Sequence, residues 1–409
     1  MKITTVKGTN DYLPEEVRLR DYLQNCILNT YIDAGFERIM TPAIEDIENL
    51  DKSDGGDNLN LIFKIMKRGD KLTKAIKSGD EKSFCDMGLR YDLTLPLSRY
   101  YANNREQLVL PAKCIQIDKV YRAERPQKGR LREFVQCDID IIGSSSISSE
   151  IELIHTTAKA LLSLDIKDFT VKINDRRILR GLLLNTGFEE NQLDSVCITF
   201  DKLDKIGAEG VTGELIEKGF NDGAIRKFSE IISKPLTLES VKTVCGDEAT
   251  EDIETIIKSA KELSEGAYNI KFDISLVRGQ GYYTGTVFEI VSDKFKGSIA
   301  GGGRYDNLIG KFTGENIPAV GFSIGFERIF ALLTEAGYKI PDAKKRIALL
   351  HDKSQITDAI KAAEQLRGEY DVVIYEKPKK LSKYLDKIQS KGYYGFCFLG
   401  EEIRELKND

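Results

Sequence analysis

The sequence has little histidine and no long apolar stretch. Its two histidines are His155 and His351, and His155 lies among apolar residues at helical spacing, which favours packing over chemistry. So few histidines argue against a histidine-activated nucleophile and against a His-rich metal site. No segment approaches the ~20 apolar residues that cross a bilayer, and the N-terminal MKITTVKGTNDYLPEE lacks the apolar core of a signal peptide. We therefore expect a cytoplasmic protein without a membrane partner.

Cysteine pairs at metal-binding spacing are also missing. The seven cysteines occur singly, at Cys26, Cys85, Cys114, Cys137, Cys197, Cys245 and Cys397. We expect reduced core residues, no disulfide and no metal site built by the protein. The chain lacks an excess of basic charge too, since its net charge is -5. No DNA partner is therefore expected, and any RNA contact has to rest on local basic patches.

A length of 409 residues exceeds one ordinary core, so we expect two or three domains. Apolar periodicity between residues 170 and 268 predicts helices joined by polar links, which indicates a mostly helical insertion. After Pro341 the pattern alternates strand and helix, from Ile347–Leu350 to Tyr394–Leu399. That β-α-β-α-β order favours a small parallel sheet at the end of the chain.

The most informative stretch is Tyr121–Gly143, in which polar and apolar residues alternate. The polar positions are Arg122, Glu124, Arg130, Arg132, Phe134, Gln136, Asp138 and Asp140. The apolar positions are Leu131, Val135, Cys137, Ile139 and Ile141. This alternation predicts strands with one buried face, and Arg125–Gly129 predicts the loop of an antiparallel hairpin.

The polar face of this hairpin is sorted by residue type. Arginines lie at one end, Phe134 lies in the middle, and Asp138 and Asp140 lie at the other end. Charged residues on a strand are usually just solvated, but this sorting favours a site for a nucleotide and an amino acid together. Phosphates suit the arginines, a base suits the ring, and amine or imidazole groups suit the carboxylates.

A second candidate is Asp92-Leu93-Thr94, within Gly88–Pro96, which we interpret as a strand ending at Pro96. On a strand, Asp92 and Thr94 would share one face about 7 Å apart. A carboxylate and a hydroxyl at that spacing suit an ammonium group. The alternative interpretation is an ordinary strand end.

Two glycine-rich regions complete the set of candidates. In Leu276–Gly285, glycines next to Arg278 and to the pair Tyr282 and Tyr283 predict backbone that approaches a ligand closely. Gly301-Gly302-Gly303 and the later segment ending at Arg328 follow neither the Walker pattern nor the dinucleotide fingerprint. Taken alone, all these glycines could simply permit tight packing.

Taken together, these stretches resemble the histidyl-tRNA synthetase family of class II aminoacyl-tRNA synthetases. The matching segments are GTNDYLPEE, GFERIMTPAIE, LRYDLT, ERPQKGRLREF, QCDIDIIG, VRGQGYYTGTVFE and AVGFSIGFERI. The resemblance implies an α+β fold, with an antiparallel catalytic sheet from residues 1–168 and 270–336 flanked by helices. A helical insertion would occupy 169–269, and a short α/β domain similar to the family's anticodon-binding domain would occupy 342–409.

The resemblance also implies an activity and its substrates. The family ligates L-histidine to tRNA(His) with ATP and Mg²⁺ through a histidyl-adenylate, and its first class motif, here GFERIMTPAIE, builds a homodimer. For ATP it implies Arg122 at the α-phosphate, Glu124 at the adenine or magnesium-bound phosphates, Arg130 at the γ-phosphate, Phe134 against adenine and Arg328 as a clamp.

For histidine, the family pattern places Asp92, Thr94 and Gln136 at the amino group, and Asp140 and Tyr283 at the imidazole. Leu93 and Tyr282 would lie beside them. Arg122 and Arg278 would act on the reacting carboxylate and the α-phosphate, as the catalytic residues.

The chain departs from the family pattern in two places. Gly281 stands where many members carry a carboxylate, which puts the positioning of Arg278 in doubt. The last domain stops soon after Phe398-Leu399-Gly400, so reduced anticodon contact is expected. The main alternative function is a non-catalytic paralogue, such as the regulatory subunit of ATP phosphoribosyltransferase, which lacks much of the ATP-binding arginine set that is present here.

Overall fold

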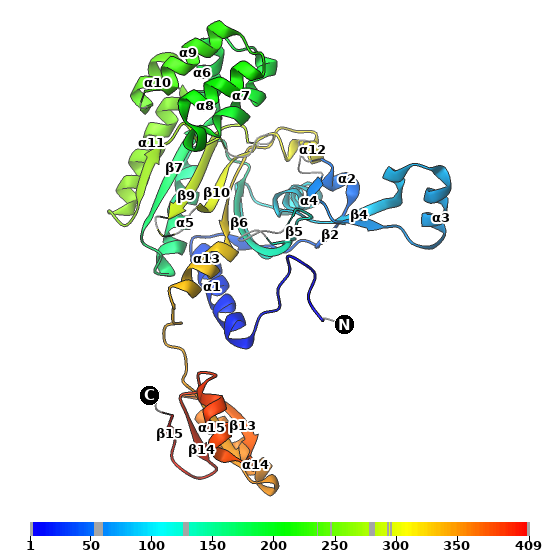
Figure 1. The fold of residues 1–409 in the computed structure, drawn as a ribbon, viewed down its shortest axis with the longest axis vertical. Coiled ribbons are helices and arrows are strands. Elements are labelled where there is room, and N and C mark those ends of the chain that lie inside the picture. The colour runs from blue at the N-terminus through cyan, green and yellow to red at the C-terminus, as the bar shows by residue number, and fades with distance from the viewer. Residues whose placement is uncertain are drawn as a thin grey trace. The chain divides into compact units, whose positions relative to one another are not determined.

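The structure of the chain is a computed structural model that describes residues 3–52, 60–125, 131–234, 236–245, 248–277, 283–292, 294 and 297–406. It divides into two compact units, Met1–Gly337 and Tyr338–Asp409 (Figure 1). No helix in the described ranges is long and apolar enough to cross a membrane. The larger unit carries every candidate site residue that the structure describes.

A sheet of eight described strands forms the centre of the larger unit. Across the sheet the order is β1 (Glu37–Arg38), β5 (Ala112–Tyr121), β6 (Glu133–Ile142), β11 (Ala319–Gly325), β10 (Ser298–Arg304), β9 (Thr286–Ser292), β7 (Phe169–Asp175) and β8 (Asn269–Phe272). The pairings are antiparallel except at the two edges, where β1 pairs with β5 and β8 pairs with β7 in parallel. The predicted α+β fold with an antiparallel sheet is confirmed.

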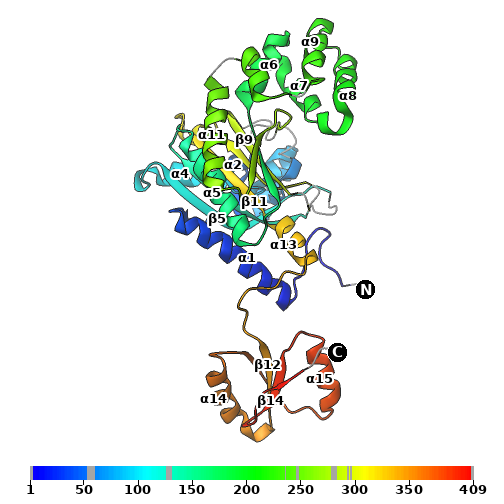
Figure 2. The same ribbon diagram turned by 90° about the vertical axis from the view of Figure 1, so that its left-hand side faces the viewer.

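Three helices cover one face of this sheet and leave the other face for the site. They are α1 (Pro14–Asp33), α5 (Ser148–Ser163) and α11 (Glu248–Ser264), which lie along the same side of the strands (Figure 2). The helix α13 (Phe326–Glu335) follows β11 directly. Because the helices bury the apolar positions of β6, its alternate positions point to the opposite face.

The predicted hairpin is formed by β5 and β6, which pair from Ala112 with Ile142 to Tyr121 with Glu133. The predicted alternation of β6 is confirmed, because Cys137, Ile139 and Ile141 are buried. Its polar face is not solvated, however, since Asp138 is 5% exposed and Asp140 is 3% exposed. The sorted polar face therefore lines an enclosed site.

The predicted strand Gly88–Pro96 is wrong in its second half. The strand β4 covers Cys85–Leu89, and the helix α4 begins at Thr94 and ends at Asn104. Asp92 stands just before this helix, where its Oδ1 atom accepts a hydrogen bond from the Leu95 backbone N–H at 3.2 Å. A carboxylate in that place satisfies an N–H that the first helical turn leaves unpaired. Asp92 and Thr94 are therefore neighbours at a helix start and do not share a strand face.

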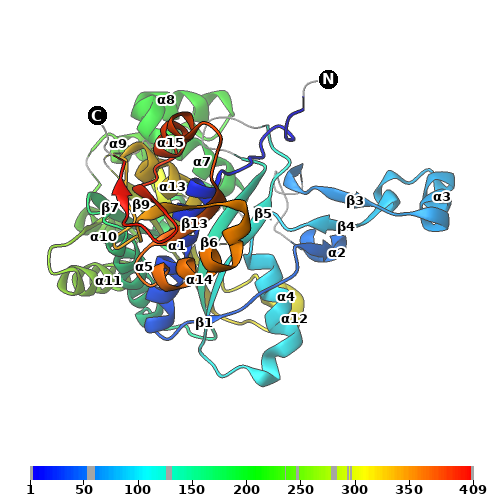
Figure 3. The ribbon, with the colours of Figure 1, turned by 90° about the horizontal axis from the view of Figure 1, so that it is seen from below.

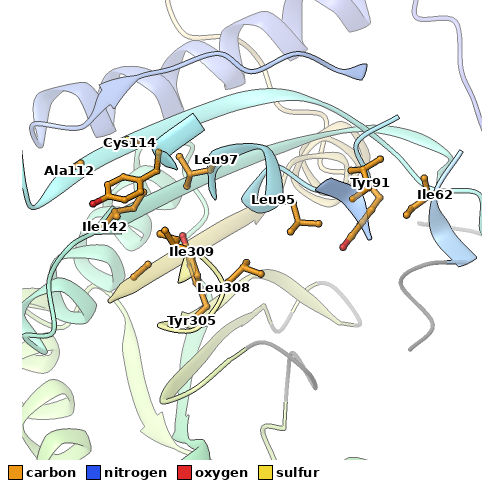
Figure 4. Close-up of a cluster of buried hydrophobic side chains, with 13 residues drawn as sticks. Ile62, Tyr91, Leu95, Leu97, Ala112, Cys114, Ile142, Tyr305, Leu308 and Ile309 are labelled. Carbon is orange, nitrogen blue, oxygen red and sulfur yellow. The ribbon is translucent and has the colours of Figure 1, made fainter. Parts of the chain in front are cut away.

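An apolar cluster fixes the position of α4 under the sheet (Figure 4). Leu95 and Leu97 of α4 pack there with Tyr91, Tyr305 and Ile309, among other residues. The same contacts hold the segments before α4 and after β10 in place. Tyr91 and Tyr305 thus reach the edge of the site as members of a packed core.

A three-stranded sheet, in the order β2 (Ile44–Asp46), β4 and β3 (Lys64–Met66), adjoins this cluster. The short helix α2 (Ile47–Leu50) follows β2, and α3 (Gly69–Ser78) lies between β3 and β4. In Figure 3, β3, β4 and α3 project sideways from the body of the larger unit. These elements bring the chain back to the site at Tyr91.

Helices fill most of the predicted insertion, but its first residues form a strand of the central sheet. The described helices are α6 (Arg176–Thr186), α7 (Leu193–Phe200), α8 (Leu203–Glu217), α9 (Asp222–Ile232), α10 (Leu238–Cys245) and α11. Residues Phe169–Asp175 form β7, which pairs with β9 in the central sheet. The helical part therefore begins at Arg176, seven residues later than predicted, and is continuous with the sheet at both ends.

The smaller unit has the predicted β-α-β-α-β order. Its elements are β12 (Arg346–His351), α14 (Ile356–Leu366), β13 (Asp371–Glu376), α15 (Leu381–Gln389), β14 (Gly395–Phe398) and β15 (Arg404–Glu405). The strands β13, β12 and β14 are parallel, and β15 adds an antiparallel edge. Separate apolar clusters pack on the two faces of this sheet, which is typical of a parallel sheet covered by helices.

An ion pair connects the N-terminal helix to the segment that carries Arg328. Arg20 of α1 donates two hydrogen bonds to Glu327, each at 2.7 Å, and Glu327 also accepts from the Val135 backbone N–H at 3.1 Å. Arg20 is 7% exposed and stacks on Tyr12 at 4.1 Å. This pair therefore joins α1, α13 and β6 in one buried contact.

We expect Glu327→Gln to lower the free energy of unfolding of the larger unit by about 3 kcal/mol, because it leaves the Arg20 guanidinium buried without a charge partner. Urea denaturation followed by circular dichroism measures the change. The control is Glu315→Gln, which removes an exposed pair with Arg105 and should change the free energy by less than about 1 kcal/mol. Equal effects of the two substitutions would contradict the argument.

Candidate functional site

A cavity of about 170 Å³ opens on the uncovered face of the central sheet. Its lining residues are Leu61, Tyr91, Asp92, Thr94, Arg122, Gln136, Asp138, Asp140, Tyr283, Gly301, Gly302, Tyr305, Gly321, Phe322 and Ser323. This volume far exceeds the ~15 Å³ that one water molecule needs. Strands β6, β10 and β11 form the floor, and the segment before α4 forms one wall. The cavity can therefore hold a small polar molecule.

Three carboxyl groups point into this cavity, and burial changes the pKa of each. Burial raises the pKa of Asp138 to about 7, with a further contribution from the nearby Asp92. Burial also raises the pKa of Asp92 to about 6. The pKa of Asp140 lies well above its usual range because the group is buried and because Asp138 repels its charge. Such a cluster favours a cationic ligand, which would supply the missing positive charge.

The amide of Gln136 adds an unsatisfied acceptor to this acidic group. Its Nε2 atom donates to Ser323 Oγ at 3.2 Å and lies 3.3 Å from both Asp138 oxygens. Its Oε1 atom is buried and finds no hydrogen-bond partner within the part of the chain that the structure describes. A buried acceptor without a donor is costly, so a donor on the ligand is expected here.

Two tyrosines border the imidazole end predicted for this site. Tyr305 donates a hydrogen bond to Asp140 Oδ1 at 2.5 Å, which holds that carboxyl group in one orientation. Tyr283 lies in the cavity wall, as predicted. An acid and a hydroxyl side by side can both accept and donate hydrogen bonds, as a ring with two nitrogens requires.

The floor of the cavity depends on glycine at one position of β10 and one of β11, Gly302 and Gly321. A Cβ atom on Gly321 would lie 2.0 Å from Asp140 Oδ1, and one on Gly302 would lie 2.0 Å from the Gly321 carbonyl oxygen. A side chain at Gly321 would therefore displace Asp140, and one at Gly302 would push the backbone of β11 away. The predicted close approach of glycine backbone to a ligand concerned Leu276–Gly285, whose Gly279 and Gly281 lie outside the described residues. For Gly301–Gly303, the tight packing considered as the alternative is what this strand pair shows.

Among the described residues that line the cavity, Arg122 is the basic one. Its Nε atom donates to the Tyr91 carbonyl oxygen at 3.1 Å, and its guanidinium lies 5.0 Å from the centre of the Phe134 ring. The remaining N–H groups of its fork suit the two oxygens of a phosphate or carboxylate. Arg122 and Phe134 thus lie together, in the way the polar face of the hairpin predicted.

The other predicted nucleotide residues lie outside the cavity lining. The Glu124 carbonyl oxygen accepts a hydrogen bond from Arg132 at 3.1 Å, while Arg328 of α13 donates to the Ser298 carbonyl oxygen on β10. Arg328 comes three residues after Gly325, which pairs with Gln136 in the sheet. It therefore lies near the beginning of β6, the end that carries Phe134. Arg130 lies outside the described residues.

Among the predicted histidine-binding residues, Asp92, Thr94, Gln136, Asp140 and Tyr283 all line the cavity. Leu93 does not, because it is fully buried and its carbonyl oxygen accepts a hydrogen bond from Gln116 at 3.2 Å. The predicted Arg278 and Tyr282 lie outside the described residues.

Three polar side chains of the cavity, those of Asp138, Tyr305 and Ser323, received no ligand-binding role in the prediction, although Asp138 was placed on the predicted polar face. Asp138 shares the strand face of Asp140, so the alternation of β6 was sufficient to include it. Tyr305 follows the three glycines of β10, and that position was a usable signal. Ser323, which hydrogen-bonds to Asp138, carried no local signal because the contact joins residues far apart in the sequence.

The raised carboxyl pKa values predict that, in the absence of ligand, the free energy of unfolding falls as pH rises. The pKa of Asp138 is about 7 in the folded chain and about 3.9 in an unfolded one. The folded state therefore binds more protons between these values, and stability is lost as pH increases through that range. We expect Asp138→Asn to raise the free energy of unfolding by about 1–3 kcal/mol at pH 8 and to have little effect near pH 4.

Denaturation at the two pH values measures this difference, with the wild-type chain as the reference. A stabilisation of equal size at pH 4 and pH 8 would show that packing, and not charge, causes it. The same substitution should weaken binding of a cationic ligand, which separates the stability effect from the functional one.

Comparisons with known proteins agree with this geometry. A sequence model described as histidyl-tRNA synthetase matches residues 8–329. The chain is 41% identical to a protein named histidine–tRNA ligase from Leifsonia xyli subsp. xyli, with all of this chain and 97% of that protein covered. It is 35% identical to a protein of the same name from Christiangramia forsetii, with 97% of this chain and 92% of that protein covered.

Solved structures show the same fold. A histidyl-tRNA synthetase from Nostoc sp. PCC 7120 superposes with a TM-score of 0.80 at 28% identity, covering 97% of this chain and 91% of that one. A Bacillus halodurans structure, described as an ATP phosphoribosyltransferase regulatory subunit/histidyl-tRNA synthetase, has a TM-score of 0.79 at 21% identity, covers 98% of this chain and 100% of that one, and shows the fold alone. From the family match and the full-length relatives, this chain belongs to the histidyl-tRNA synthetase family.

Proposed function

We propose that this protein ligates L-histidine to tRNA(His) with ATP, through a histidyl-adenylate. The observation that carries the proposal is the cavity lined by the buried Asp138 and Asp140, the half-buried Asp92 and the unsatisfied Gln136 oxygen. These acceptors match the ammonium and the ring N–H of histidine. The enzyme class rests on membership of the family, and the histidine site rests on this acidic cavity.

The first step needs no basic residue from the protein. The histidine carboxylate, already ionised, attacks the α-phosphorus of ATP; a new carboxyl oxygen–phosphorus bond forms while the bond to the bridging oxygen breaks, and pyrophosphate leaves with that oxygen. Negative charge grows on the phosphate oxygens, which we assign to Arg122 and, by resemblance, to Arg278. Catalysis then consists of positioning and charge stabilisation.

For the nucleotide we propose Phe134 against adenine, with Arg130 and Arg328 at the outer phosphates. No group of three or more His, Cys, Asp or Glu side chains that could hold a metal ion is found in the described ranges. Magnesium therefore fits best as an ion that ATP phosphates hold, with Glu124 nearby, where it would neutralise phosphate charge. In the second step, a ribose hydroxyl oxygen of the tRNA bonds to the histidyl carbonyl carbon, the bond from that carbon to the phosphate oxygen breaks, and AMP leaves with the hydroxyl proton.

Histidine selection is proposed to depend on Asp140, held by Tyr305, and on Tyr283. An amino acid that lacks ring nitrogens would leave the buried Asp140 carboxyl group without its partner. Sites of this kind discriminate by roughly 10⁴ or more. The Arg122 guanidinium, beside Tyr91, would meet the carboxylate at the other end of the same ligand.

Histidine-dependent exchange of pyrophosphate into ATP tests the first step. With magnesium we expect exchange in the wild-type protein, and Asp140→Asn should lower kcat/KM for histidine by about 100-fold. Glu133→Gln is the matched control, because Glu133 lies on the same strand but bonds to Lys119 outside the cavity. Absence of exchange in the wild-type protein would contradict the proposal and favour the regulatory paralogue.

A homodimer is proposed as the functional form, with a cytoplasmic location. Its support is the exposed edge strand β1 and the apolar Met40 just after it, which is 73% exposed. Unpaired sheet edges and exposed apolar side chains are usually covered in the assembled protein. Sedimentation should give a dimer at micromolar concentration, and Met40→Asp should shift it towards monomer. A wild-type monomer at that concentration would refute this assembly.

A further inference from the structure

The arm formed by β3, α3 and β4, residues 64–89, projects from the body of the larger unit (Figures 1 and 3). Its two ends meet at the wall of the cavity. Leu61, just before β3, lines the cavity, and its carbonyl oxygen accepts a hydrogen bond from the Ala123 backbone N–H at 2.8 Å. At the other end, β4 leads within three residues to Asp92. The arm therefore starts and ends beside the reacting groups.

The charge of this arm is opposite to that of the whole chain. Residues 64–89 contain seven basic side chains and four acidic ones, a net charge of +3, in a chain whose net charge is -5. The basic residues are Lys64, Lys67, Arg68, Lys71, Lys74, Lys77 and Lys82. All except Lys67 are exposed, and within the described ranges none of the seven has an ion-pair partner.

The helix α3 presents three of these charges together. Lys71, Lys74 and Lys77 follow one another at intervals of three, so they lie within about 120° of the helix surface. The helix begins at Gly69, ends before Gly79, and buries Ala75, which lies just outside the arc of the three lysines. Its ten residues span roughly 15 Å. The result is a basic ridge, Lys71, Lys74 and Lys77, on a rigid element.

Exposed lysines at this spacing repel one another only weakly, by about 0.2–0.5 kcal/mol per pair, but together they create a local positive potential that attracts a polyanion. Phosphates along a nucleic acid backbone are spaced closely enough for successive lysines to contact neighbouring groups. The proposed reaction requires that the 3′ end of a tRNA enter the cavity next to Asp92, and the adjoining RNA must then pass close to the arm. Charge and position therefore favour the same partner.

We propose that the arm binds the phosphate backbone of the tRNA next to its acceptor end, through Lys71, Lys74 and Lys77. The inference rests on the proposed function and adds a binding surface to it. The contact is sequence-independent, because lysine ammonium groups meet phosphates as point charges. A surface on the partner subunit is the competing occupant, since Met66 and Ile76 of the arm are 54% and 57% exposed.

The test is the triple variant Lys71→Glu, Lys74→Glu and Lys77→Glu, measured with an unmodified tRNA(His) transcript. All three side chains are exposed, so the fold should persist. We expect the KM for tRNA to rise at least about tenfold near 0.15 M salt, and the salt dependence of tRNA binding to lose about 2–3 from its log–log slope. Histidine-dependent pyrophosphate exchange, which needs no tRNA, should stay at the wild-type rate.

The matched control reverses three lysines at the opposite edge of the central sheet, Lys167→Glu, Lys271→Glu and Lys294→Glu. It makes the same change in net charge but should leave the KM for tRNA and the salt slope close to those of the wild type. Equal losses in both variants would show a general charge effect and overturn the proposal. So would an unchanged KM in the arm variant, or a loss of dimer in sedimentation.

Failure of this proposal differs from failure of the proposed function. If the wild-type protein shows no pyrophosphate exchange and no charging of the transcript, the ligase activity itself is refuted. If the wild-type protein charges the transcript and the arm variant does so with the same KM, only the role of the arm is refuted.

Discussion

The cavity depends on three carboxyl groups, those of Asp92, Asp138 and Asp140, whose desolvation the nearby Arg122 offsets only in part. Asp138 and Asp140 are nearly fully buried on one strand face, and Asp92 approaches them from the start of α4. Burial opposes the charged form of each group, which the raised pKa values express. A ligand that carries positive charge and ring N–H donors removes this penalty. In the proposed function, this deficit of positive charge is what favours histidine as the ligand.

Keeping such a deficit requires a rigid surround. Gly302 and Gly321 let β10 and β11 approach closely enough for the Asp140 side chain to lie directly over backbone, and the Tyr305 hydroxyl fixes its orientation. Behind them, Arg304 makes a paired contact with the buried Glu150 of α5, at 2.7 Å for each of two hydrogen bonds. Packing on the helix-covered face thus holds in place the strands that carry the buried carboxyl groups on their other face.

The sequence predicted the parts of the site that local pattern controls. Alternation along β6 was enough to place Gln136 and Asp140 on one face, because side-chain direction in a strand follows from position alone. The same reasoning gave a wrong prediction for Gly88–Pro96, which is a strand only as far as Leu89. Its apolar residues are consistent with a strand, but Arg90 is buried and bonds to the carbonyl oxygens of Thr41 and Lys119, which turn the chain before α4. Long-range contacts of this kind leave no local pattern.

The dimensions of β6 connect the two halves of the proposed reaction. Phe134 and Asp140 lie six residues apart on the same face, a separation of about 20 Å at the usual rise of an antiparallel strand. Gln136 and Asp138 lie between these two residues on the same face. Arg122 follows the end of the neighbouring strand β5 and lies beside Phe134. A base at one end and an imidazole at the other then place the phosphate and the carboxylate between them. One strand can thus set the order of groups in the adenylate, because each of its outward positions meets a different part of the ligand.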